Sequence, residues 1–182
     1  MDRHKIYIKE ALESEHSKRI TNQIIDYVGD DPLKFKALMD LFFSDDWCMN
    51  QRASWPIPFI LKKHSELVQP YLDRFISNLE NPKHNAVIRN TLRFLAEIEI
   101  PEELQGKCYE FCLRTIKNIK EPVANKIFAM TVLLNIALPY PELLNELKII
   151  IETQMEYEKP GFRSRGRKTL ASIEKRLKEK RF

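Results

Sequence analysis

The sequence predicts an all-α protein built as a stack of about four helix pairs and closed by a basic C-terminal helix. Four glycines in 182 residues are too few for the turns of a β-rich fold. Within each segment, apolar residues recur every three or four positions, which is typical of amphipathic helices. An acidic residue before Leu, or before Pro-Leu, returns at steps of 34, 37 and 39 residues, at Leu33, Leu67, Leu104 and Leu143. Steps of this length indicate stacked helical repeats.

The length and composition favour one domain over residues 1–182, because 43% hydrophobic content is enough for one continuous core. Residues 1–14 show weak periodicity and predict a weakly defined N-terminal helix. No apolar leader opens the chain, and no run approaches the roughly 20 apolar residues that cross a bilayer. We therefore expect a cytoplasmic protein, with Cys48, Cys108 and Cys112 as reduced core thiols.

The first predicted pair begins with a helix from Ser17 to Val28, which Gly29 ends. Its partner begins at Asp31-Pro32, because proline suits the first turn of a helix.

In the second pair, Asp45-Asp46 cap a helix that runs toward His64. The two prolines of residues 54–58 predict a kink or a break near Trp55. Its partner helix starts at Ser65-Glu66 and carries apolar residues to Leu79.

The third pair is expected from Pro82 to Ile98 and from Pro101 to Ile119, with Ile98 and Ile119 facing inward. The fourth pair opens at Pro122 and Pro141. Its first helix is apolar nearly all round, which predicts burial on more than one side. Asn125, Lys126 and Asn135 on that helix are expected to make turn or interhelix hydrogen bonds.

Residues 160–182 are predicted to form the capping helix, and they change the charge balance of the protein. Residues 159–182 hold ten Lys or Arg and two Glu, a net charge of +8, whereas residues 1–158 carry −4. A helix with a narrow apolar stripe is the expected end of a repeat stack.

Repeat length, prolines at helix starts and a polar closing helix together resemble HEAT-like or armadillo-type α-α superhelices. This resemblance covers about residues 15–182 and implies a curved rod whose concave surface holds another macromolecule. The HEAT-like alkylpurine DNA glycosylases are similar in repeat type, in basic character and in having paired tryptophans. In that family a catalytic Asp follows a Trp by four residues. Here Gln51 follows Trp47 and Phe59 follows Trp55, so this catalytic residue has no counterpart.

No catalytic, metal-binding or cofactor-binding motif emerges, and we expect a protein that is not an enzyme and needs no cofactor. The four histidines form no HExxH pattern, the cysteines form no CxxC pair, and no glycine-rich phosphate loop is present.

Clustered basic residues are the main functional lead. Arginine side chains bind phosphate bidentately, which makes a nucleic-acid or other phosphate contact one interpretation. The other interpretation is intramolecular pairing with Glu152, Glu156 and Glu158, or a solvated helix face. The candidate phosphate ligands are Arg89, Arg93, Arg163, Arg165, Arg167 and Lys168.

Two functions follow from these patterns. The first is a non-catalytic scaffold that binds a protein partner, with Trp47, Trp55 and Tyr71 as interface candidates because Trp and Tyr dominate interface energetics. The alternative is nucleic-acid binding through the basic C-terminal helix. An enzyme with an unrecognised pocket is the third and weakest hypothesis.

Overall fold

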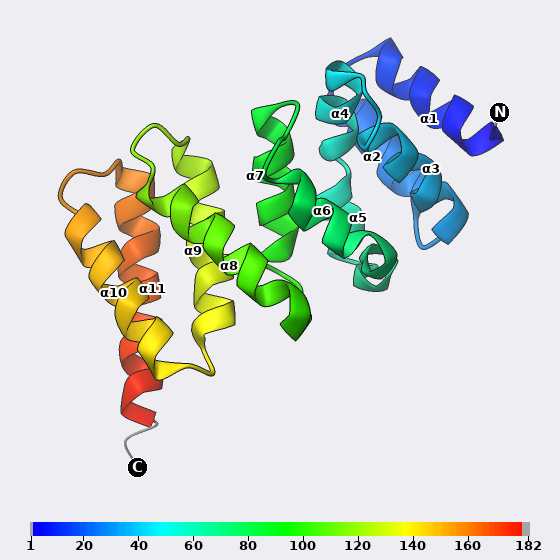
Figure 1. Cartoon of the computed structure of the whole chain (residues 1–182). Coiled ribbons are helices and arrows are strands. Elements are labelled where there is room, and N and C mark those ends of the chain that lie inside the picture. The colour runs from blue at the N-terminus through cyan, green and yellow to red at the C-terminus, as the bar shows by residue number, and fades with distance from the viewer. Residues whose placement is uncertain (1, 180–182) are drawn as a thin grey trace. The chain divides into compact units, whose positions relative to one another are not determined.

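The computed structural model describes residues 2–179, and all of its regular elements over this range are helices (Figure 1). The predicted all-α helical-repeat class is confirmed. The helices form two compact units, Met1–Ile98 and Glu99–Phe182, and each unit is described by itself. The single domain over 1–182 stays a prediction, and residues 180–182 of the predicted capping helix lie outside the described residues.

The first unit contains seven α-helices and one 3₁₀ helix among its described residues. In sequence order they are α1 (Arg3–Ser14), α2 (Lys18–Val28), α3 (Pro32–Phe42), α4 (Trp47–Ser54), α5 (Ile57–Leu61), η1 (Ser65–Tyr71), α6 (Leu72–Asn78) and α7 (Asn85–Leu95). Helix α3 packs on α1 and α4, and α7 packs on α4 and α5. The centre of this unit is a row of aromatic rings, in which Phe75 lies 5.0 Å from Phe42 and 4.8 Å from Phe94, measured between ring centroids.

Short polar side chains cap the first four helices of the first unit. Asp31 accepts hydrogen bonds from the amides of Leu33 and Lys34, and Asp46 accepts from those of Cys48 and Met49. These contacts satisfy N–H groups that have no partner inside the helix. Asp2 and Ser17 cap α1 and α2 in the same way.

The N-terminal segment is better ordered than its sequence suggests, because α1 is a regular twelve-residue helix. Its buried side chains are Ile8, Ala11 and Leu12, a narrow stripe that packs against α3. Such a stripe gives a weak periodic signal, and the tertiary contact supplies what the local pattern lacks.

Proline explains both irregularities of the first unit. The predicted break near Trp55 is confirmed, since α4 ends at Ser54 and α5 begins at Ile57 after Pro56. The helix expected from Ser65 to Leu79 is divided into η1 and α6, and Pro70 lies inside η1. Proline has no amide hydrogen to donate to the preceding turn, so a regular α-helix does not form through it.

The second unit contains four longer helices within its described part. They are α8 (Glu102–Lys117), α9 (Val123–Ala137), α10 (Pro141–Gln154) and α11 (Pro160–Glu179). Helix α9 packs most extensively on α8 and also contacts α11 and α10 (Figure 1). The surface of α9 is apolar nearly all round because α9 is covered by helices on several sides. Cys108 and Cys112 are buried free thiols as predicted, and burial raises the pKa of Cys112, whereas Cys48 is half-buried.

Two expectations for the third predicted pair are wrong in detail. Helix α8 ends at Lys117, so Ile119 lies beyond it and is 89% exposed instead of facing the core. Helix α7 begins at Asn85, three residues after Pro82, because the His84 ring accepts a hydrogen bond from the amide of Ala86 and caps the helix.

Two positions inside the second unit, Lys126 and Gly166, allow α11 and the segment before it to pack closely on the other helices. The Lys126 side chain is 1% exposed, and its ammonium group pairs with the Glu158 carboxylate, which joins α9 to the segment before α11. A β-carbon on Gly166 would lie 2.7 Å from the Met155 sulfur and 3.1 Å from Ile151 Cγ2. Glycine therefore permits the close approach of α11 to α10. On α9, Asn125 donates to Glu121 as part of a helix-start contact, whereas Asn135 is exposed.

Candidate functional site

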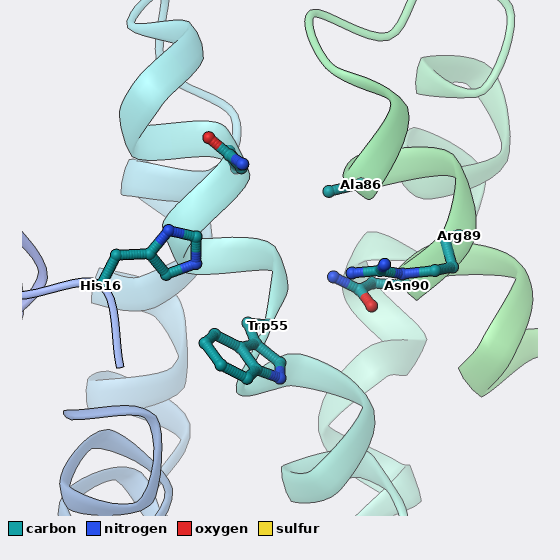
Figure 2. Close-up of a pocket in the computed structure, with 6 residues that line it drawn as sticks. His16, Trp55, Ala86, Arg89 and Asn90 are labelled. Atoms are coloured by element: carbon teal, nitrogen blue, oxygen red, sulfur yellow. The ribbon is translucent and has the colours of Figure 1, made fainter. Parts of the chain in front are cut away.

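A recess of about 280 Å³ lies between α4 and α7 in the first unit (Figure 2). We call it the α4–α7 recess. Its lining comes from the α1–α2 connection, from α4 with its C-terminal end, and from the first half of α7, and consists of His16, Gln51, Trp55, Ala86, Arg89 and Asn90.

One wall of the α4–α7 recess is aromatic. Trp55 is the residue that follows α4, where the prolines end the helix, and its side chain is half-buried. The His16 ring meets it edge to face, with the ring centroids 5.3 Å apart and the planes at 82°. Such edge-to-face contacts hold the two rings in a defined relative orientation.

The opposite wall is polar and comes from α7. Asn90 is 4% exposed, and its amide nitrogen donates to the Ser54 hydroxyl over 2.9 Å. Ser54 in turn donates to the Gln51 carbonyl oxygen over 2.7 Å. Because buried amides require partners, this series of hydrogen bonds ties α7 to the end of α4 and sets the width of the recess.

Arg89 is the cationic group of the α4–α7 recess. Its side chain extends from α7 toward Trp55, next to the amide of Asn90 (Figure 2). It is exposed, and within residues 2–179 no carboxylate lies within 4.0 Å of it. The guanidinium donors are therefore available to a ligand.

The other predicted residues of the first unit have different surroundings. The Arg93 guanidinium lies 4.5 Å from the centre of the Phe59 ring, a cation–π contact outside the recess. Trp47 is 58% exposed and stacks on His84 with 6.1 Å between ring centroids. Tyr71 packs edge to face on buried Phe35 and is half-buried, so it contributes partly to the core.

The basic residues of α11 belong to the second unit. Arg163, Arg167 and Lys168 are exposed and Arg165 is half-buried. Within residues 2–179 none of them forms an ion pair with the predicted glutamates. Glu158 pairs with Lys126, and Glu152 lies 3.8 Å from Lys148. The structure thus places Arg89 and Trp55 at one recess of the first unit and residues 163–168 on one helix of the second. That Arg89 and the basic residues of α11 share one surface stays a prediction.

His16, Gln51 and Asn90 were not predicted as site residues. One sequence signal points toward Arg89: basic residues recur at exact steps of 37 residues, at Arg52, Arg89, Lys126 and Arg163. Two of them are occupied internally, since Arg52 donates to the Leu12 carbonyl at the end of α1 over 2.6 Å and Lys126 pairs with Glu158. His16 lies in a connection, and no periodic pattern marks it.

A second recess, of about 260 Å³, lies in the second unit, between the start of α8 and the α9–α10 turn. Tyr109 lines it, and burial, with Glu146 adding to the effect, raises the pKa of this phenol to about 12. At neutral pH Tyr109 is thus a neutral hydrogen-bonding group.

Residues 2–179 contain no group of three or more His, Cys, Asp or Glu side chains placed to hold a metal ion. None of the helices in this range has the length and apolar character required to span a membrane.

Comparison with known proteins gives one match. The family model described as "HEAT repeat domain" matches residues 8–173. No curated protein and no solved structure matches the sequence. The matched range covers both units and nearly every helix, so the chain belongs to the HEAT repeat domain family.

Proposed function

We propose that this protein is a non-catalytic helical-repeat scaffold that binds a protein partner through the face containing the α4–α7 recess. The observation that carries the proposal is Arg89, an exposed guanidinium without an acidic partner in residues 2–179, beside a half-buried tryptophan. Arg and Trp are the residue types that contribute most to binding energy at protein interfaces. Proteins of HEAT repeats often mediate protein interactions, which supports the same function.

The lining of the α4–α7 recess favours binding over catalysis. Its six side chains include no carboxylate, hydroxyl or thiol, so the lining itself supplies no nucleophile for His16 to activate. What they offer is hydrogen-bond donors and acceptors beside an aromatic wall, which suits recognition of an extended segment.

The scaffold function is tested by quantitative capture of proteins from source-cell lysate on immobilised protein, with Trp55→Ala and Trp47→Ala as variants. We expect one or a few proteins to be retained in fixed stoichiometry and their retention to fall at least about tenfold with Trp55→Ala. Trp47→Ala should have a smaller effect, because Trp47 lies outside the recess. A capture profile equal to that of blank resin contradicts the proposal.

The second candidate function is phosphate-backbone binding through α11. It is favoured by the absence of carboxylate partners for Arg163, Arg167 and Lys168 within residues 2–179. Binding of labelled single- and double-stranded oligonucleotides, measured at two salt concentrations, tests it. Affinity that falls steeply with salt, and that Arg163→Gln with Arg167→Gln removes, supports it. Absence of binding at low salt rejects it.

A further inference from the structure

We infer that the α4–α7 recess is a carboxylate-binding pocket, which receives one acidic group of the partner protein between Arg89 and Trp55. This inference rests on the proposed scaffold function and specifies its chemistry. The carboxylate can come from an Asp or Glu side chain or from the partner's terminal carboxyl group, because Arg89 would bind either in the same way.

The recess has the size of a pocket for one side chain. Its volume of about 280 Å³ lies just below the roughly 300–1,000 Å³ of sites that enclose whole small molecules. Trp55 and His16 offer ring surfaces against which the methylene groups of an acidic side chain pack. The recess therefore accepts an acidic residue with its apolar stem.

The charges indicate a carboxylate and not a phosphate. Arg89 is the one Lys or Arg among the six lining residues. A guanidinium forms two parallel hydrogen bonds with one carboxylate, and this pairing balances the charges one to one. A phosphate group carries up to two negative charges, and the recess offers no second permanently charged partner.

Hydrogen bonds hold the α7 wall of the recess in position at Asn90. Asn90 is fixed by Ser54, which is itself fixed by the Gln51 carbonyl oxygen, so the α7 wall does not need to reorganise on binding. A preformed wall limits the entropy lost when a ligand binds. Arg89 is exposed and outside this series of hydrogen bonds, so it can be changed without disturbing the wall.

The experiment measures the binding of short fluorescent peptides to the full-length protein. One carries two Glu beside a Phe and an amidated C-terminus, the second has Gln in place of Glu, and the third is the Gln peptide with a free C-terminus. A phosphoserine peptide of the same length completes the set. Arg89→Gln removes the charge, Arg89→Lys keeps the charge without the planar fork, and Arg93→Gln is the matched control four residues further along α7.

We expect the Glu peptide or the free-C-terminus peptide to bind and the neutral amidated peptide to bind at least about tenfold more weakly. Binding of the Glu peptide identifies the ligand as a side-chain carboxylate, and binding of the free-C-terminus peptide identifies it as the terminal carboxylate. Loss of a charged hydrogen-bonded pair should weaken binding about 10- to 100-fold with Arg89→Gln. Arg89→Lys should weaken it less, and Arg93→Gln should change it less than about twofold, which excludes a general charge effect.

Three results overturn the inference: binding of both carboxylate-bearing peptides no tighter than that of the neutral amidated peptide, tighter binding of the phosphoserine peptide, or equal losses with Arg89→Gln and Arg93→Gln. Capture from lysate separates this failure from failure of the scaffold itself. A partner that the wild type and Arg89→Gln retain equally leaves the scaffold standing and refutes the carboxylate pocket. A wild-type protein that captures nothing refutes the scaffold.

Discussion

Arg89 in the first unit and Lys126 in the second lie exactly 37 residues apart, yet their surroundings are opposite. Arg89 is exposed at a recess, and no carboxylate of residues 2–179 reaches it. Lys126 is buried and paired with Glu158. The comparison shows that basic residues at one spacing of the repeat can have different surroundings: Lys126 is neutralised inside its unit, whereas the Arg89 guanidinium has no carboxylate partner within residues 2–179. A repeat fold permits this because each repeat needs only enough internal contacts to pack on its neighbours.

The largest expected effect comes from removing the partner of Lys126. Glu158→Gln leaves a buried ammonium group without its counter-charge, and we expect the free energy of unfolding to fall by about 3 kcal/mol. Urea unfolding followed by circular dichroism measures this change. The double variant Lys126→Met with Glu158→Gln should recover most of the loss, because it removes the buried charge as well. If Glu158→Gln is as stable as the wild type, the Lys126–Glu158 ion pair does not stabilise the second unit, and the contrast with Arg89 fails.

The next largest effect should come from the close packing of α11 on α10. In Gly166→Ala the new β-carbon would meet the side chains of Met155 and Ile151. Overpacking of this kind destabilises by about 1–3 kcal/mol, part of which the better helix propensity of alanine offsets. Gly106→Ala is the matched control on α8, because nothing lies within 4 Å of its new β-carbon. Thermal unfolding should show a lower Tm for Gly166→Ala and an unchanged or higher Tm for Gly106→Ala.

A smaller effect is expected at the wall of the α4–α7 recess. Ser54→Ala leaves the buried Asn90 amide without its acceptor, and we expect a loss of about 1–2 kcal/mol in the free energy of unfolding. The same variant should weaken binding of an acidic peptide, because Asn90 is no longer held. If stability falls and peptide affinity does not, the hydrogen-bonded wall is structural alone.

The smallest effect on stability is expected for Arg89→Gln, the variant that should most affect binding. Exposed substitutions without internal partners usually change the free energy of unfolding by less than about 0.5 kcal/mol. A Tm within a degree or two of the wild type is expected. A loss as large as that of Glu158→Gln would mean that Arg89 and Lys126 have the same structural role, which removes the contrast between the two units.

The sequence by itself determined the all-α repeat class, the positions of most helices and the break near Trp55. These features depend on local chemistry: apolar spacing, capping by Asp31 and Asp46, and the missing amide hydrogen of proline. It also singled out Arg89 and Trp55 as candidate site residues, although for separate functions.

Only the tertiary structure decided that these two residues share a recess, that His16 and Asn90 join them, and that Lys126 is neutralised by Glu158. Each of these outcomes depends on contacts between residues more than 30 positions apart, and helical periodicity reports which face of a helix is apolar but not what that face meets. For the same reason the pattern placed Ile119 in the core, although α8 ends two residues before it. The surroundings of a side chain depend on where neighbouring helices stop and how closely they approach, and packing sets both.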